Sequence, residues 1–328
     1  GIVAEIDAKT GYVAGRPQSA ERDEKLEWLQ AMRLQCEAVV AMANRYADLA
    51  EELSAHATLQ RADELRRIAD VCRHVPAFPA RTFHEAVQSF WFIHYALFST
   101  QTNLSCGRLD QYLYPLLKQD LDSGSIELNE AQEIVDCLWL RFNDRAQIRR
   151  ENFYVENNGG ASGAGGRNGT PESSASSKSS GKAAGVVVDT GPTKYLVGHR
   201  QRFRYSADAA DAINHFGQNI LLSGIRPDGT DGTNELTYLC LNSLEKFAFT
   251  SPVVTVRLHS GSPQELVTRA AEVLKSGGGM PYINNDDVVV QAYVDLGVPL
   301  EDARGYANSN CWETMIEGKS DQELIRGM

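Results

Sequence analysis

The residue types that could carry out chemistry lie together near the end of the chain, in Cys311-Trp312-Glu313. A thiol has a weak S–H bond, so its sulfur can exchange a hydrogen atom. A carboxylate two residues away can take a proton from a substrate hydroxyl that lies within hydrogen-bond reach. Partial burial would raise the pKa of Glu313 toward neutrality. Residue type alone favours a packed cysteine and a surface glutamate, because packing explains most free cysteines.

The other five cysteines show no pattern of a metal or disulfide site. Cys36, Cys72, Cys106, Cys137 and Cys240 form no C-x-x-C pair and no Cys/His cluster at zinc spacing. Free thiols in a reducing compartment are the better interpretation. We therefore expect a cytoplasmic protein with no metal bound to this chain.

The composition is that of a soluble globular protein and argues against two classes of partner. Apolar residues make up 42% and charged residues 23% of the 328 residues, as in packed domains. The formal net charge of -11 argues against nucleic acid and anionic membranes, because both bind clustered Lys and Arg. No apolar run reaches the ~18 residues that a membrane-spanning helix needs.

Apolar residues at helical spacing predict helices along most of the chain. Thr82 is a predicted N-cap, and Glu85 completes a capping box with it. The helix that follows is apolar nearly all round, so we expect it to be buried. The predicted helical segments are Glu24–Ala50, Arg61–Arg73, Phe83–Phe98, Leu128–Asn143, Asp208–Leu222, part of Thr230–Phe247, Pro263–Ser276, Asp286–Leu296 and a turn at Glu301–Tyr306.

Two short segments are predicted as strands, and one long segment is predicted to lack structure. Pro252–His259 alternates apolar and polar residues, and Tyr282–Asn284 is short and strand-like. Helices that alternate with short strands favour an α/β protein. Residues 157–185 are rich in Gly, Ser, Ala and Asn and contain no large apolar residue, so we expect a flexible surface insertion there.

Four separated stretches resemble the glycyl-radical enzymes of the pyruvate formate-lyase superfamily, and they occur in that family's order. They are R-Y-A-D-L-A at 45–50 with P-A-R-T-F-H-E-A at 79–86, G-R-L-D-Q-Y-L-Y-P at 107–115, S-G-I-R-P-D-G-T-D-G-T-N-E-L at 223–236, and L-E-D-A-R-G-Y at 300–306 leading to C-W-E at 311–313. One such match would be weak, but four in order argue strongly against chance.

The resemblance implies an α/β barrel of two half-barrels wrapped in helices, with a loop that carries the catalytic cysteine through its centre. Residues 1–328 would be an incomplete part of one pyruvate formate-lyase-like domain. The C-terminal glycine-radical domain, with its R-V-x-G-Y-like motif, is expected to be absent from these residues. We therefore expect the chain alone not to turn over.

The resemblance implies that Cys311 is the thiyl site and that Glu313 is the general base of the C-x-E eliminase branch. Removal of a C–H hydrogen, with deprotonation of the adjacent hydroxyl, gives a ketyl-like radical that expels a neighbouring leaving group. The expected reaction is therefore cleavage of a C–O, C–N or C–S bond in a small hydroxylated substrate. Pyruvate formate-lyase itself uses two adjacent cysteines, whereas Cys311 is flanked by Asn310 and Trp312.

Four positions depart from the family pattern and could shape the substrate pocket. Asn310 replaces the usual glycine before the catalytic cysteine, and Trp312 replaces a small aliphatic residue. Thr102 and Asn103 stand where glycerol and diol dehydratases carry a His-Ser pair, which argues against a glycerol-like substrate.

Three charged residues could be substrate ligands, namely Arg108, Asp110 and Arg257, and the two arginines would suit a carboxylate. Buried structural roles with satisfied partners explain Arg108 and Asp110 better.

The family also implies partners and a radical that is not stored in this chain. A radical S-adenosylmethionine activating enzyme would install the glycyl radical, and no cofactor is expected to bind to the chain itself. A homodimer is the family habit. Two alternatives stay open: a radical arylacetate decarboxylase, since such enzymes also carry C-x-E, and a non-catalytic fragment or decoy subunit.

Overall fold

The computed structural model describes residues 1–100, 104–143, 186–189, 194–197, 218–249, 251–309 and 312–320. The chain divides into two compact units, one made of Gly1–Arg145 with Asn214–Met328 and the other of Ala146–Ile213. In the second unit, β1 (Val186–Asp189) and β2 (Lys194–Val197) form an antiparallel pair. The expected insertion at 157–185 lies outside the described residues.

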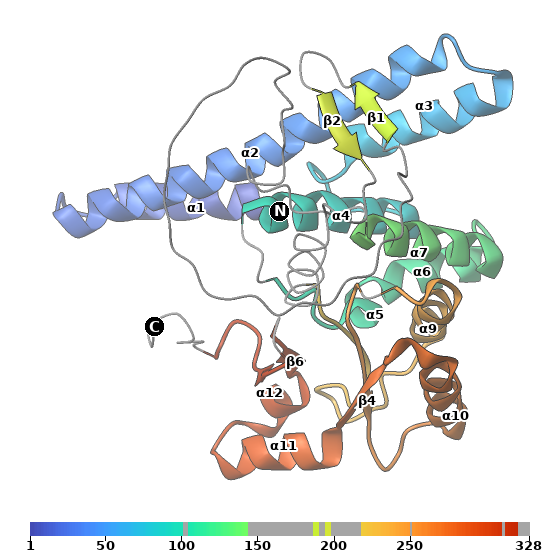
Figure 1. Ribbon diagram of the computed structural model, residues 1–328. Coiled ribbons are helices and arrows are strands. Elements are labelled where there is room, and N and C mark those ends of the chain that lie inside the picture. Colours follow the sequence, from blue (N-terminus) through green and yellow to red (C-terminus); the bar gives the residue numbers. More distant parts are fainter. Residues whose placement is uncertain are drawn as a thin grey trace, which may run out of the picture. The chain divides into compact units, whose positions relative to one another are not determined.

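The first unit opens with three helices, α1 (Ile2–Ala14), α2 (Ala20–Ser54) and α3 (Leu59–His74). Figure 1 shows α1 and α3 lying along the long helix α2. The hydroxyl of Ser19 caps α2 by accepting a hydrogen bond from the N–H of Arg22. Small residues let α2 and α3 approach closely, and their shared core contains Ala43, Ala47, Ala50, Leu65 and Ala69.

Helix α4 (Phe83–Thr100) begins at the predicted cap, with one difference. The hydroxyl of Thr82 accepts a hydrogen bond from the N–H of Glu85 (3.2 Å), as a capping box requires. The Glu85 carboxylate, however, accepts from the main-chain N–H of Arg81.

The prediction that this helix is buried all round is wrong. The structure buries Phe83, Phe92 and Phe98, with Phe83 and Phe92 in different cores, whereas Ile93 and Leu97 are more than two-fifths exposed. None of the described helices is both long and apolar enough to cross a membrane.

Three further helices follow, α5 (Leu109–Tyr112), α6 (Tyr114–Ser123) and α7 (Leu128–Asn143). The bounds of α7 are those that its apolar periodicity predicts. The sequence patterns did not predict α6, which ends at Gly124 with a positive φ of 70°.

A parallel sheet of order β3-β4-β5 forms the centre of the first unit, from β3 (Ile220–Ser223), β4 (Val254–Leu258) and β5 (Tyr282–Asn285). Ile220 pairs with Val254, and Arg257 pairs with Asn284. The predicted helix at 208–222 is therefore wrong for the end of that range. A short apolar run suits a buried strand as well as a helix, and here β4 supplies its hydrogen-bond partner.

Helices cover both faces of this sheet, as parallel strands require. Figure 1 shows α9 (Glu235–Phe247) and α10 (Gln264–Val273) on one side of β4, and α11 (Asp286–Asp295) and α12 (Leu300–Arg304) on the other. The π-helical turn η2 (Leu274–Gly278) continues α10. Ile220 and Leu222 belong to the core with α9, whereas Leu221 packs in a second core with Val290 and Tyr306.

Candidate active site

A small hairpin carries the residues that the sequence singles out for chemistry. Its strands are β6 (Ala307–Asn308) and β7 (Thr314–Met315), which pair antiparallel around the loop 309–313. Of the predicted site residues, Trp312 and Glu313 belong to the described part of this loop. Four others, Thr102, Asn103, Asn310 and Cys311, lie outside the described residues.

Glu313 is tied to the start of the loop at two points. Its main-chain carbonyl accepts a hydrogen bond from the N–H of Ser309 (2.7 Å). Its carboxylate accepts a hydrogen bond from the Ser309 hydroxyl. The side chain is otherwise exposed, so the expected partial burial is not found in this structure. The two hydrogen bonds join the first residue of the loop to the last.

Trp312 has a main-chain conformation that residues other than glycine rarely adopt. Its φ is +70°, in the left-handed region that favours glycine. The indole packs against Tyr282 of β5, with 5.2 Å between ring centroids. Its Nε1–H is buried and has no hydrogen-bond partner among the described residues. The bulky residue beside Cys311 therefore forms an aromatic pair with the neighbouring strand.

Polar side chains from three neighbouring strands attach the hairpin to the sheet. Asn219, directly before β3, donates its amide to the carbonyl of Ser309. The Asn308 amide donates to the hydroxyl of Thr255 in β4 (3.4 Å) and accepts from Asn284 in β5 (3.1 Å). Sequence reasoning missed these residues. The one signal for Asn219 was a polar residue directly before an apolar run, in a segment predicted as helix.

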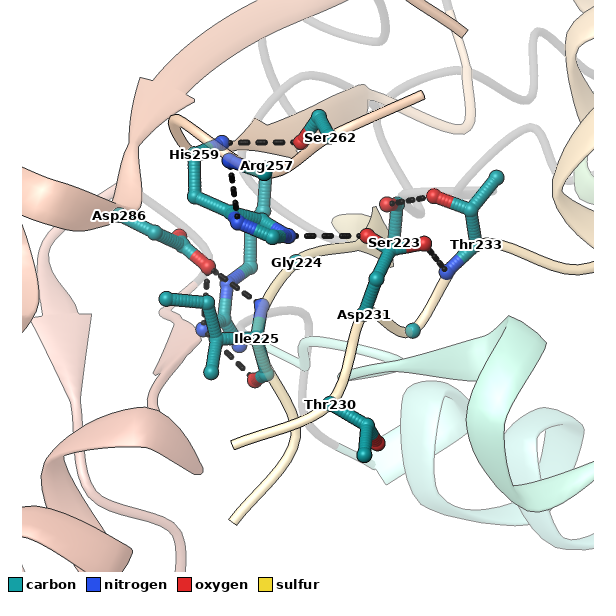
Figure 2. A network of polar contacts seen from close by, with 12 residues as sticks. Ser223, Gly224, Ile225, Thr230, Asp231, Thr233, Arg257, His259, Ser262 and Asp286 are labelled. Carbon is teal, nitrogen blue, oxygen red and sulfur yellow. Dashed lines mark hydrogen bonds and ion pairs between the residues drawn. The ribbon is translucent and has the colours of Figure 1, made fainter. Parts of the chain in front are cut away.

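Arg257, a suggested substrate ligand, is a fully buried structural residue. Its guanidinium meets the buried carboxylate of Asp286 with two hydrogen bonds of 2.9 Å. It also donates to the carbonyls of Tyr306 and Arg304, and lies 3.8 Å from the Tyr306 ring centroid. Figure 2 shows Asp286 reaching both Arg257 and the main-chain N–H of Ile225. Because the guanidinium of Arg257 is already paired with Asp286 and with main-chain carbonyls, it is not available to bind a substrate carboxylate.

Arg108 is likewise buried, as its structural interpretation predicts, but its Nε has no hydrogen-bond partner among the described residues. It donates to the carbonyl of Ser223 (2.9 Å) and lies near that of Arg304. Burial, together with the charge of Arg257, lowers the pKa of Arg108 to about 10. The group therefore stays charged at neutral pH, and it joins the 107–115 motif to the end of β3.

Asp110 connects the motif at 107–115 to the motif at 223–236 through hydrogen bonds. Its carboxylate accepts from the N–H of Ser223 (2.7 Å) and from the hydroxyl of Thr237 (2.5 Å). Burial raises the pKa of Asp110, and this effect exceeds the lowering that the hydrogen bonds cause. Asn234, which caps α9, donates its amide to the Asp110 carbonyl (3.0 Å). The predicted structural role of Asp110 is confirmed, because each carboxylate oxygen has a partner.

A histidine–aspartate pair closes the loop after β4 onto the turn after β3 (Figure 2). The Nε2 of His259 lies 2.9 Å from the carboxylate of Asp231, and the N–H of Gly261 donates to its Nδ1. These contacts assign the proton to Nε2. Asp231 also accepts from the N–H of Thr233 (3.0 Å). The pair therefore fixes loop geometry at the ends of two neighbouring strands.

A cavity of about 840 Å³ lies elsewhere in the first unit, among α2, α3, α4, α6 and α7. Tyr46, His84 and Trp91 are among its lining residues, and burial lowers the pKa of His84. No described residue of the hairpin lines this cavity. The cavity is thus separate from the site at residues 309–313.

Comparison with known proteins gives one family along the whole chain. The profile of the family described as pyruvate formate lyase-like matches residues 1–328. The chain is 32% identical over 302 residues to isethionate sulfite-lyase of Nitratidesulfovibrio vulgaris, covering 90% of this chain and 30% of the relative. It is 29% identical over 296 residues to trans-4-hydroxy-L-proline dehydratase of Clostridioides difficile, covering 89% and 31%.

The fold agrees with these relatives. A solved structure that concerns 1,2-propanediol dehydration in Roseburia inulinivorans matches with a TM-score of 0.72 and 30% identity, over 97% of this chain and 34% of that one. The chain thus spans about a third of the length of the relatives that it matches, and the predicted barrel fold, incomplete in this chain, is confirmed. The chain belongs to the pyruvate formate-lyase-like family of glycyl-radical enzymes.

Proposed function

We propose that the protein is a glycyl-radical eliminase that cleaves a C–O, C–N or C–S bond in a small hydroxylated substrate. One observation carries the proposal: the hairpin is hydrogen-bonded to Asn219 and to strands β4 and β5, and the carboxylate of Glu313 in its loop accepts a hydrogen bond from Ser309. Relatives named as a sulfite-lyase and a dehydratase support cleavage of a C–S or C–O bond.

The proposed reaction starts once the glycyl radical has taken the hydrogen atom of the Cys311 thiol. The Cys311 thiyl takes a hydrogen atom from the carbon that bears the hydroxyl, which leaves a carbon radical and the S–H group. Glu313 takes the hydroxyl proton, so the radical expels the leaving group from the adjacent carbon with its electron pair. The product radical, now beside a carbonyl, recovers a hydrogen atom from Cys311.

The proposal includes partners outside this chain. A radical S-adenosylmethionine activating enzyme would install the glycyl radical, which supplies the one-electron oxidation of the Cys311 thiol. No cofactor would bind to the chain itself. We also propose a cytoplasmic, dimeric protein and one pyruvate formate-lyase-like domain in which 157–185 is an insertion. Asn310, Trp312, Thr102 and Asn103 are proposed to line the substrate pocket.

The test is Glu313→Gln in the full-length protein, activated without oxygen and assayed with hydroxylated sulfonates, hydroxyproline and diols. We expect kcat to fall by about 100-fold or more, because a positioned base contributes roughly that factor or more. The glycyl radical signal should stay at the wild-type level. Glu301→Gln is the control, since Glu301 is an exposed residue of α12 outside the hairpin.

The products decide between the candidate reactions. An eliminase of this kind releases a carbonyl compound together with sulfite from the hydroxylated sulfonates or water from the diols. Loss of water from hydroxyproline, which has a single hydroxyl, gives no such carbonyl. Carbon dioxide from aryl acetates, with no activity on the hydroxylated panel, would replace the proposal with a radical decarboxylase. A protein that acquires no glycyl radical from any activating enzyme would support the decoy alternative.

A further inference from the structure

We propose that Asn219 is a positioning residue, whose amide holds the cysteine-bearing loop where the thiol of Cys311 can exchange a hydrogen atom with the radical glycine. The inference rests on the proposed function. Its starting point is the hydrogen bond from the Asn219 amide to the Ser309 carbonyl. Two residues of chain span at most ~7 Å, so fixing Ser309 restricts where Cys311 can lie.

The main chain of Asn219 is itself immobilised, so it can serve as a fixed point. Its carbonyl accepts hydrogen bonds from the N–H of Cys106 (2.7 Å) and the hydroxyl of Ser105 (3.2 Å). The preceding Gln218 has a φ of +70° and bonds through its side-chain amide to the Ser251 hydroxyl (2.7 Å). Both residues are fully buried. These hydrogen bonds fix the main chain directly before β3, and the Asn219 side chain extends from there to the hairpin.

The oxygen of the same amide reduces the net contribution of the Asn219 side chain to stability. Its Oδ1 is buried and has no hydrogen-bond partner among the described residues. A buried acceptor without a partner costs about 1–3 kcal/mol. An apolar side chain of similar shape would avoid this cost, so stability alone gives no reason for an asparagine here. The hydrogen bond to Ser309 is the contact that distinguishes Asn219 from such a side chain.

The other contacts of the hairpin cannot replace this one. Thr255 and Asn284 hold the side chain of Asn308, one residue further from the cysteine. The contacts of Ser309 with Glu313 close the loop on itself. The Trp312 indole also packs against Tyr282 of β5, but it does so through a side chain and not through the main chain of the loop. The Asn219 amide joins the main chain of the loop to the sheet at the Ser309 carbonyl.

The experiment is solvent-deuterium exchange into the glycyl radical of the activated full-length protein, which needs no substrate. In deuterated water the Cys311 thiol carries deuterium, and its exchange with the radical glycine collapses the doublet that the α-hydrogen produces in the electron paramagnetic resonance spectrum. For Asn219→Leu we expect an unchanged radical yield and thermal midpoint, with exchange slowed by about 100-fold, as a 1 Å misplacement of reacting groups can cause.

Two further variants make the result specific. Ser243→Ala is the control, because it removes a buried hydrogen bond to Asp136 (2.6 Å) in α9, away from the hairpin. We expect it to exchange at the wild-type rate. Asn219→Asp should exchange faster at low pH, because a protonated carboxyl can donate to the Ser309 carbonyl and an ionised one cannot. This pH dependence also tests the inference if Asn219→Leu fails to fold.

Each outcome is decisive. Exchange within twofold of wild type in Asn219→Leu, or exchange in Asn219→Asp that stays as slow at low pH as in Asn219→Leu, would overturn the positioning role and leave the proposed function standing. A wild-type radical that exchanges no deuterium, or one that still exchanges in Cys311→Ala, would overturn the proposed function and the inference with it.

Discussion

At the scale of residues, buried charged groups build the scaffold of the site. Arg257 is engaged by a carboxylate, two carbonyls and an aromatic ring, and Arg108 by main-chain carbonyls. The proposed chemistry is left to the loop of the β6–β7 hairpin. Substrate contacts should therefore be sought in that loop and at Thr102 and Asn103, and not in these arginines.

The buried pair of Arg257 and Asp286 predicts a large effect on stability. Arg257→Met would leave the Asp286 carboxylate fully buried without its cation. Breaking such a pair from one side costs about 3–5 kcal/mol. We expect that loss in the free energy of unfolding of the full-length protein, measured with urea.

A surface pair provides the matched control for this prediction. Arg269 lies 2.7 Å from Glu245 at the surface, and surface pairs contribute about 1 kcal/mol or less. Arg269→Met should therefore change little. Equal losses in the two variants would show that the buried pair has no special role.

At the scale of elements, the sequence was sufficient where the pattern was long and regular. The periodicity of Leu128–Asn143 gives α7 with its observed bounds, and the alternation near Val254 gives β4. Reasoning failed at Ile220–Leu222, because three apolar residues cannot distinguish a helix from a strand whose partner lies more than 30 residues away. The hairpin around Cys311 was missed because its strands have two residues each.

The sequence indicated which residue types form the candidate site, but not which residues hold its loop in place. The C-W-E triplet is visible in the sequence, and the roles given to Cys311 and Glu313 remain predictions. The contacts from Asn219, Thr255 and Asn284 depend on the register of three strands, which no local pattern of residues contains. Arg257 could not be assigned as structural from the sequence, since its partner Asp286 is 29 residues away.

The turn after β3 requires glycine at position 224 for two separable reasons. Gly224 has a φ of +85°, and a Cβ there would lie 2.6 Å from Nε of Arg257 and 2.7 Å from Oδ2 of Asp286. Gly277 has a comparable φ of +98°, but a Cβ there would meet nothing within 4 Å. The two positions therefore share the backbone strain and differ in the clash.

This comparison gives a prediction for alanine substitutions. Gly277→Ala should lower the free energy of unfolding by about 1 kcal/mol, the cost of a strained φ. Gly224→Ala should lower it by that amount and by a further ~2 kcal/mol or more, because the buried ion pair must shift. Equal losses in urea unfolding would mean that the space around Gly224 can relax without cost.

At the scale of the whole molecule, the sheet of the first unit has an unfinished edge. Among the described residues, β5 pairs only with β4, and Tyr282 and Ile283 are 45% and 47% exposed. An open edge with apolar side chains invites pairing with another strand. The chain also spans only about a third of its relatives' length. We propose that the rest of the full-length barrel covers β5.

Hydrogen exchange of the full-length protein tests this coverage. If another strand pairs with β5, amides in 282–285 should exchange as slowly as those of β4, because both would be in a closed hydrogen-bond ladder. Peptides that contain the exposed turn at Gly277 provide the fast reference. Exchange of 282–285 at the rate of that turn would show that the edge stays open.

The central claim is that catalysis runs through the sulfur of Cys311, and the most direct measurement is turnover by Cys311→Ala. The full-length protein would be activated without oxygen and its glycyl radical quantified before hydroxylated substrates are added. We predict that the variant acquires the radical like the wild type and forms no carbonyl product. Product formation by Cys311→Ala at a rate near that of the wild type would contradict the account.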